Sequence, residues 1–303
     1  MALSEISITL EKTVNHLVHS GIDMLEYIPK SGKSLPSVES LKTIVEILRE
    51  ILFPGYFGKI ITKPTMLAYS TGGNLEQLYE LLSEQIHSGL CFNYKEDSDE
   101  IKTKAERLTL DFIESIPETR RLLFTDVKAM YDADPAAKNL EEIIFCYPTI
   151  RAMINYRLAH QLLVLKVPLL PRIISEMAHS ETGIDIHPGA TIGEHFCIDH
   201  GTGVVIGETC IIGNNVRLYQ GVTLGAKKFS LDDSGNPLKD EPRHPIIEDN
   251  VVIYSNANIL GRIVVGKNSV IGGNVWITND VPPNSKITQA KVVQEHFYFG
   301  SGI

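Results

Sequence analysis

The sequence predicts an α+β protein in which an N-terminal helical domain is followed by a left-handed parallel β-helix. Apolar residues recur at helical spacing up to about residue 183, and a six-residue period replaces that spacing from residue 184. The period is interrupted at only two places. We therefore expect a helical domain over 1–183, a β-helix over 184–287 with an inserted loop at 225–245, and an extended tail over 288–303.

The first half is predicted to form helices because its apolar residues lie three and four positions apart, as in VEILREILF (45–53) and LEQLYELLSEQI (75–86). Four residues stand where helix N-caps are expected: Ser37, Thr71, Asp134 and Thr149. Asp134 precedes Pro135, and proline is favoured in the first turn of a helix. An ordinary packed helical domain accounts for nearly every residue of this half.

The six-residue period of the second half is carried by one branched apolar residue per hexad. These anchors are Ile186, Ile192, Ile198, Ile206, Ile212, Leu218, Leu224, Ile247, Ile253, Ile259, Val265, Ile271 and Ile277. A second apolar or small residue follows most anchors after four positions. Two inward positions per hexad, with Gly or Asn at the corners, form one flat side of a three-sided coil on which the next coil stacks. This pattern predicts a scaffold and leaves the reaction open.

Composition and charge exclude several classes of protein. A net charge of −9 argues against nucleic acid as the main partner, since phosphates are held by surplus Lys and Arg. The four cysteines form no CxxC pair, which predicts neither a metal module nor a disulfide framework. The N-terminus lacks a secretion signal, and the apolar stretch 160–172 is too short and too often interrupted to span a bilayer. We expect a cytoplasmic protein.

The two interruptions of the period are the places to seek function, because local rules are broken mainly at sites with another task. Two extra residues in IDHGTGVVIGE (198–208) introduce Asp199 and His200. The excursion from 225 to 245 ends with Arg243 and His244.

Five motifs around these interruptions occur in a fixed order: DIHPGATIG (185–193), DHGTGVVIGET (199–209), GVTLGA (221–226), RHP (243–245) and VPP (281–283). Through them, the chain resembles a serine O-acetyltransferase of the hexapeptide-repeat class over residues 130–287. The resemblance implies transfer of the acetyl group of acetyl-CoA to L-serine, the first step of cysteine biosynthesis, with acetyl-CoA as co-substrate and no tightly bound cofactor.

Acetyl transfer to an alcohol needs a base for the hydroxyl proton, and a histidine titrates in the suitable range. His200 is our candidate. Asp185 lies about one coil earlier in the chain, where its carboxylate would orient the imidazole and stabilise the imidazolium. The resemblance assigns the same two roles to these residues.

A zwitterionic amino acid needs a cation for its carboxylate and an anion for its ammonium group. Arg243 and His244 suit the carboxylate. The resemblance assigns them that role, and it assigns Asp199 and Asp134 to the ammonium group. For Asp134, a purely structural role as a helix cap explains the residue equally well.

The resemblance also indicates where acetyl-CoA would bind. Backbone N–H groups near Gly225 and Ala226 would hold the thioester oxyanion, and the pantetheine arm would pass Ser255 and Gly273. Ala226 and Tyr254 depart from the family, which usually has glycine at both positions. Four cations near these coils could meet phosphate groups or belong to a solvated surface: Lys227, Lys228, Arg262 and Lys267.

Enzymes of this class complete each site between neighbouring subunits, so the resemblance implies a homotrimer or a dimer of trimers. It further implies inhibition by L-cysteine at the serine site. The last segment, QEHFYFGSGI (294–303), ends in Ile303 like the tails that bind O-acetylserine sulfhydrylase.

Three alternatives remain open from the sequence. The first is a hexapeptide acetyltransferase with another hydroxyl acceptor, such as homoserine or a sugar. The second is a zinc-dependent hydratase of the γ-carbonic-anhydrase type, although a third histidine to join His195 and His200 is missing. The third is a trimeric scaffold without catalytic activity.

Overall fold

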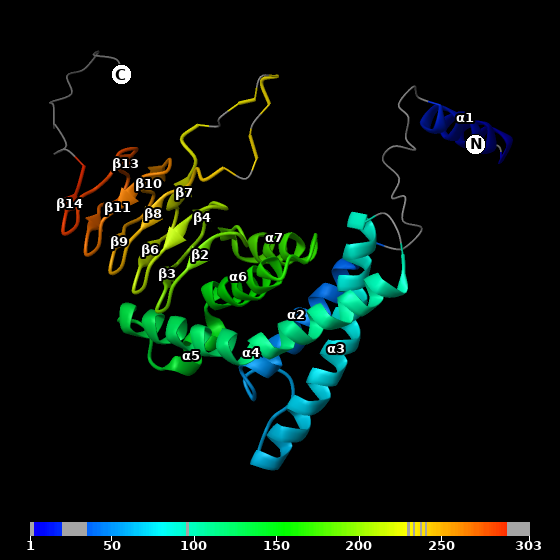
Figure 1. The fold of residues 1–303 in the computed structure, drawn as a ribbon, viewed down its shortest axis with the longest axis horizontal. Helices are drawn as coiled ribbons and strands as arrows, with labels where there is room; N and C mark the ends of the chain where they lie inside the picture. The colour runs from blue at the N-terminus through cyan, green and yellow to red at the C-terminus, as the bar shows by residue number, and fades with distance from the viewer. Residues whose placement is uncertain are drawn as a thin grey trace.

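The computed structural model describes residues 3–19, 35–94, 97–228, 231–232, 234–236, 238–239 and 241–289. Within these ranges, helices come first and short strands follow (Figure 1). The helices are α1 (Leu3–Val18), α2 (Val38–Leu52), α3 (Pro64–Tyr94), α4 (Asp99–Ala133), α5 (Leu140–Cys146), α6 (Pro148–Val164) and α7 (Leu170–Thr182). None of the helices so described is both long and apolar enough to cross a membrane.

Helix boundaries match the sequence expectations only in part. Ser37 caps α2, with its Oγ accepting a hydrogen bond from the Ser40 amide. Thr71 lies inside α3, because that helix begins earlier, at Pro64. Thr149 is buried inside α6, where Pro148 takes the first helical position. The N-cap expectations at Thr71 and Thr149 were therefore wrong, because side-chain capping preference is a weak local signal beside the packing of a long helix.

The strands form a three-sided parallel β-helix, as predicted. One sheet contains β1 (Asp185–Ile186), β4 (Val205–Ile206), β7 (Thr223–Gly225), β10 (Asn258–Leu260) and β13 (Trp276–Ile277). The second contains β2 (Thr191–Ile192), β5 (Ile211–Ile212), β8 (Ile246–Ile247) and β11 (Val264–Val265). The third contains β3 (Cys197–Asp199), β6 (Arg217–Tyr219), β9 (Val252–Ile253), β12 (Val270–Ile271) and β14 (Lys286–Ile287).

The hexad anchors stack directly on one another along the β-helix. In the first sheet, Ile206 pairs with Ile186 on one side and with Leu224 on the other. Leu224 in turn pairs with Ile259, even though about thirty-five residues separate them in the sequence. All thirteen predicted anchors are buried. Because a one-residue slip would move each anchor to the outer face, their columns fix the register of the coils.

A buried ion pair between two helices also bonds to the backbone of the first coil and so joins the helical part to the β-helix. Arg157 of α6 donates from Nε and Nη2 to the two carboxylate oxygens of Asp126 on α4, at 2.7 and 2.9 Å. Arg157 also donates to the carbonyl of Gly193 in the first coil, and Asp126 accepts from the amide of Phe196. These contacts fix the C-terminal end of α4 beside β3.

The inserted loop leaves the β-helix after β7 and returns before β8, which pairs with β5 in the ordinary register. The stacking therefore continues across the loop without a gap. Parts of the loop and the tail from residue 290 onward, including Ile303, lie outside the described residues.

Candidate functional site

The predicted site residues of the β-helix gather at two of its three edges. We call the turns 199–204, 219–222, 254–257 and 272–275, which join the third sheet to the first, the His200 edge. We call the turns 187–190, 207–210, 225–245 and 261–263, which join the first sheet to the second, the His244 edge.

The two extra residues of the first turn form an outward bulge that displays His200. Five residues separate β3 from β4, whereas three separate β6 from β7 in the next coil. His200 adopts a left-handed backbone conformation with φ 57°, and its side chain is 75% exposed. Gly201 follows with φ 86°, and a Cβ there would stand 2.5 Å from the Cδ1 atom of Ile184. The bulge thus depends on a glycine directly after His200.

Two carboxylates lie beside His200. Its Nε2 is 3.9 Å from Oδ1 of Asp199. Asp134, the C-cap of α4, lies within electrostatic reach of the same imidazole. Tyr147 donates its hydroxyl hydrogen to Oδ2 of Asp134 over 2.5 Å, and the amide of Ala136 donates to Oδ1 over 2.8 Å. These bonds lower the pKa of Asp134, with the Tyr147 bond the larger cause, so that the carboxylate stays charged.

Asp134 therefore ends one helix instead of beginning the next, and the N-cap reading of this residue was wrong. The helix that follows begins only at Leu140, with Asn139 as its N-cap. Asp134 closes a tight turn through Ala136, and this turn directs its carboxylate toward the His200 edge.

Asp185 lies one coil below the bulge, at the start of β1, where it pairs with Val205 of β4. Its amide donates to the carbonyl of Val204 at the end of the bulge. No ion pair within 4 Å joins Asp185 to His200, although the structure describes both residues, and Asp199 is the carboxylate that the imidazole meets. The charge of Asp185 instead acts on His187, two residues along the strand. Orientation of His200 by Asp185 stays a prediction.

His244 is held as a neutral imidazole. The backbone N–H of Thr209 donates to Nδ1 of His244 at 3.0 Å, which makes Nδ1 an acceptor and leaves the ring proton on Nε2. The Thr209 hydroxyl lies 2.9 Å from the same nitrogen and accepts from the amides of Arg243 and His244. Burial, and then the charge of Arg243, lower the pKa of His244 to about 4. At neutral pH, this side chain is a hydrogen-bond donor without charge.

Arg243 lies next to His244 and is oriented by an acidic neighbour. Its Nη2 donates to Oε2 of Glu208 over 2.6 Å, while about a quarter of the Arg243 side chain stays exposed. A guanidinium with part of its fork turned to solvent can bind a carboxylate. The His244 edge therefore presents one fixed cation and one N–H donor side by side.

The residues expected to bind acetyl-CoA are divided between the two edges. Gly225 ends β7 and precedes Ala226 on the His244 edge. Ser255 and Gly273 lie in successive coils of the His200 edge, where a Cβ on Gly273 would approach the Ser255 carbonyl oxygen to 3.0 Å. Tyr254 stacks on Tyr219 with ring centroids 4.9 Å apart, so an aromatic pair occupies the edge beside Ser255.

The four cations considered for phosphate binding have different surroundings. Lys227 and Lys228 line a cavity of about 240 Å³ together with Arg243 and Arg262. Arg262 also donates to the backbone carbonyls of Thr209 and His244, which secures the end of the inserted loop. Lys267 lies on the third edge of the β-helix, away from this cavity.

The two edges lie too far apart within one chain to share a small substrate. From Val204 to Gly207, three extended residues of the first sheet span roughly 10 Å. His200 projects beyond one end of this span, and His244 lies over Gly207 at the other. A base must come within hydrogen-bond reach of the proton it removes. His200 and the Arg243–His244 pair thus lie on separate edges of one chain.

Comparison with known proteins identifies the family. The model for bacterial transferase hexapeptide (six repeats) matches residues 244–279. The chain is 48% identical over 302 residues to a plasmid-encoded serine acetyltransferase of Synechococcus elongatus, and the match covers 97% of this chain and 95% of that protein.

The chain belongs to the serine acetyltransferase family.

Other members agree with this assignment, which makes the chain an acyltransferase. The serine acetyltransferase of Bacillus subtilis is 46% identical over 55% of this chain and 73% of its own length. The structure of Entamoeba histolytica serine acetyltransferase 1 in complex with L-cysteine matches with a TM-score of 0.71 and 38% identity, covering 85% of this chain and 88% of that one. The Neisseria gonorrhoeae enzyme in complex with serine matches with a TM-score of 0.54 and 26% identity, covering 82% and 95%.

Sequence reasoning missed several residues that hold the candidate site residues in place. Tyr147 bonds to Asp134, Thr209 fixes the tautomer of His244, and Glu208 orients Arg243. Glu208 and Thr209 lie inside the quoted motif at 199–209, so their position near the site was available as a signal. Tyr147 carries no sequence signal, because thirteen residues and a short helix separate it from Asp134.

Proposed function

We propose that this chain transfers the acetyl group of acetyl-CoA to the hydroxyl of L-serine in a site assembled from two copies. One copy supplies the His200 edge, with Asp199 and Asp134 for the substrate ammonium group. The neighbouring copy supplies the His244 edge, with Arg243 for the substrate carboxylate. The separation of these groups on two edges of one chain is the observation that supports this arrangement.

In this proposal, His200 removes the hydroxyl proton of serine while the serine oxygen attacks the thioester carbonyl carbon. The carbonyl oxygen becomes an oxyanion, for which the backbone at Gly225 and Ala226 would supply N–H donors. Collapse of this intermediate breaks the carbon–sulfur bond, and the proton held by His200 passes to the CoA sulfur. Asp185 would orient His200 once the neighbouring copy and substrate restrict the exposed imidazole.

The amino-acid acceptor is supported by the charges of the two edges. Asp134 stays ionised because of Tyr147, and the Arg243 guanidinium is held in place by its hydrogen bond to Glu208. Carboxylates on one side and a guanidinium with a neutral imidazole on the other complement the α-ammonium and α-carboxylate groups. A sugar acceptor would leave these charges without partners.

Complementation between inactive variants tests the shared site. His200→Ala and Arg243→Ala should each abolish serine acetylation, measured as CoA thiol release. When both variants are co-expressed and assemble together, a site that joins the intact edges of two copies regains activity. Random mixing predicts roughly a quarter of the wild-type sites.

Recovery in the mixed assembly combined with inactivity of each variant alone would support the proposal. No recovery, in a sample whose mixed composition is verified by distinct tags, would place the complete site within one chain. Activity retained by His200→Ala alone would remove the general-base assignment.

The same site would bind L-cysteine as a competitive inhibitor, since cysteine differs from serine by one atom. Solved relatives support this point, because members of the family are described in complex with cysteine and with serine. Steady-state rates measured against both amino acids should show an effect of cysteine on the KM of serine.

We further propose that the segment ending in Ile303, which lies outside the described residues, binds O-acetylserine sulfhydrylase. Deletion of Gly302 and Ile303 should abolish co-purification of the two enzymes. Cys146, Cys197 and Cys210 are free thiols, which supports a reducing cytoplasm as the place of action.

A further inference from the structure

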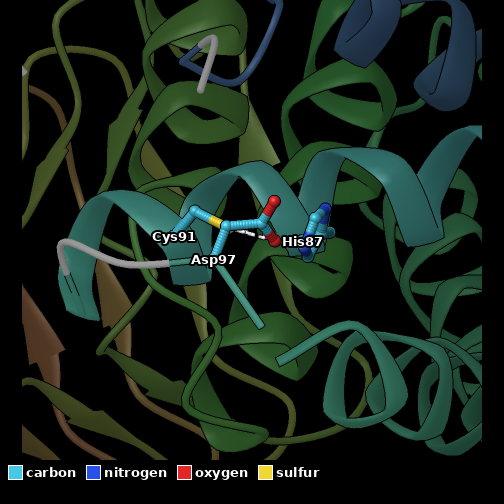
Figure 2. Close-up of side chains that lie close together, drawn as sticks. All are labelled: His87, Cys91 and Asp97. Carbon is cyan, nitrogen blue, oxygen red and sulfur yellow. Dashed lines mark hydrogen bonds and ion pairs between the residues drawn. The ribbon is translucent and has the colours of Figure 1, made fainter. Parts of the chain in front are cut away.

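Three side chains with metal-binding atoms converge at the C-terminal end of α3, far from both edges of the β-helix. His87 and Cys91 lie one helical turn apart on α3, so that both project from the same face. Asp97 reaches them from the connection that precedes α4. Figure 2 shows the imidazole, thiol and carboxylate directed toward a common point.

The three donor atoms form a nearly closed triangle. His87 Nε2 is 2.9 Å from Asp97 Oδ1 and 3.4 Å from Cys91 Sγ, and the Sγ is 3.7 Å from the same carboxylate oxygen. Around a tetrahedral zinc ion with metal–ligand distances of about 2.0–2.3 Å, the nitrogen, oxygen and sulfur ligands stand roughly 3.3–3.6 Å apart. Shifts of a few tenths of an ångström would place these three atoms at three vertices, that is one face, of a zinc tetrahedron.

We propose that His87, Cys91 and Asp97 bind a thiophilic divalent cation of the zinc class. A thiolate and a neutral imidazole favour zinc over magnesium or calcium, which prefer oxygen ligands alone. Binding releases the thiol proton of Cys91 and leaves Nε2 of His87 as the lone-pair donor, with the ring proton on Nδ1. The thiolate and the carboxylate together balance the two positive charges of the ion.

The three side chains differ in burial, so that an ion can enter the site from the solvent-exposed side. Cys91 is fully buried, whereas the side chains of His87 and Asp97 are 21% and 33% exposed. The sulfur therefore forms the inner ligand and the other two form the outer pair. A fourth position would face solvent and take a water molecule.

A purely hydrogen-bonded triad is the competing description of the same geometry. In that case, the imidazole and the thiol would donate to the carboxylate, and Asp97→Asn would preserve the contacts because its amide oxygen still accepts. A metal site responds differently, since loss of the carboxylate charge weakens the binding of a cation. Asp97→Asn therefore separates the two descriptions.

Such an ion would cross-link the end of α3 to the connection that precedes α4. Helices α3 and α4 pack along one another. Cysteine spacing does not reveal this site, because its ligands come from a helix face and from the following connection. The site is independent of the acetyl-transfer proposal, because none of its residues lies on the His200 or His244 edge.

The test titrates the full chain, freed of metal with a chelator, first with Zn²⁺ in competition with a chromophoric chelator. A second titration uses Co²⁺, whose thiolate charge-transfer absorption reports sulfur ligation. The variants are Cys91→Ser, His87→Gln and Asp97→Asn. The matched controls are Cys146→Ser, an exposed thiol on α5, and His179→Gln, an exposed histidine whose Nδ1 is 3.3 Å from Glu176.

We expect the wild-type chain and both controls to bind one zinc ion and to show the cobalt–thiolate band. The three variants should bind zinc at least about 10–100-fold more weakly, and zinc should raise the melting temperature only where binding is kept. If Cys91→Ser does not fold, the partly exposed positions 87 and 97 still decide the outcome. Unchanged zinc affinity in His87→Gln and Asp97→Asn, or a thiolate band lost only in Cys146→Ser, would overturn the proposal.

Discussion

The imidazole of His244 lies flat against the backbone of Gly207, in the adjacent coil of the β-helix. A Cβ on Gly207 would stand only 2.1 Å from Cδ2 of the ring and 2.3 Å from Nε2. Because real Cβ atoms do not approach so closely, any other residue at 207 must displace the ring. The position of the His244 N–H donor therefore depends on the absence of a side chain one coil below.

Gly207→Ala should impair serine use more than acetyl-CoA use. The added methyl group displaces His244 and removes the hydrogen bond that we propose it donates to the substrate carboxylate, which corresponds to a loss of about 10- to 100-fold in kcat/KM for serine. Initial rates over serine concentration measure this loss. Gly73→Ala on α3, where a Cβ meets open space, is the control and should behave as wild type.

Tyr147→Phe should raise the KM of serine. The hydroxyl of Tyr147 holds the Asp134 carboxylate in place and lowers its pKa, so its removal leaves the proposed ammonium-binding group less ordered. We expect an increase of about 10-fold, the scale of one hydrogen bond to a charged group, with the KM of acetyl-CoA unchanged. Tyr131→Phe on α4 serves as the control, and equal effects in both variants would contradict the role of Tyr147.

Acidification between pH 6.5 and pH 4 should destabilise the folded chain partly through His244. Its pKa is about 4 when folded and 6.5 as an ordinary histidine, so the unfolded chain binds more protons in this range. The free energy of unfolding therefore falls as the pH falls from about 6.5 toward about 4. Melting temperatures should show a shallower pH slope for His244→Gln, whereas His179→Gln, at an exposed position, should keep the wild-type slope.

Arg157→Met should strongly destabilise the chain, because it leaves Asp126 as a buried carboxylate without its cation. Loss of one partner from a buried ion pair costs about 3–5 kcal/mol, measurable by chemical denaturation. Arg121→Met removes solvent-exposed pairs with Glu118 and Glu194 and should change the stability far less than Arg157→Met, because water screens these charges. A similar loss in both variants would contradict the importance of burial.

Simultaneous replacement of Lys227 and Lys228 by alanine should raise the KM of acetyl-CoA by about 5-fold or more, through loss of cations from the cavity beside Arg243. CoA lacking its 3′-phosphate should show a smaller difference between the two enzymes if that group is the one bound. Lys267→Ala, on the third edge, is the control. An unchanged KM in the double variant would leave these lysines as solvated surface residues.

The β-helix could be predicted almost residue by residue because its determinants are local and periodic. The hexad anchors recur at fixed intervals, and Leu224 pairs with Ile259 in register despite the inserted loop. The two-residue slip before Ile206 likewise predicts the bulge that carries His200. Each of these features depends only on which residues face inward along one coil.

The helical part and the hydrogen bonds within the candidate site could be predicted less well from the sequence, because contacts between distant segments determine them. Asp134 appears as a helix start in the sequence and ends a helix in the structure. Its partner Tyr147 becomes apparent only when α4 and α6 are placed together. Arg262 appears as a surface cation, yet it donates to two backbone carbonyls of neighbouring coils.

Because β5 pairs with β8 in the ordinary register, the inserted loop can change in sequence and length without a change in the β-helix. The wall of the solenoid closes behind the loop, while Thr209 and Arg262 hold its last residues at a constant place. Insertions and deletions between Lys228 and Glu241 can therefore accumulate without moving Arg243 or His244. This segment is a natural position for grafting a peptide or a fluorescent reporter that would sense occupancy of the adjoining site.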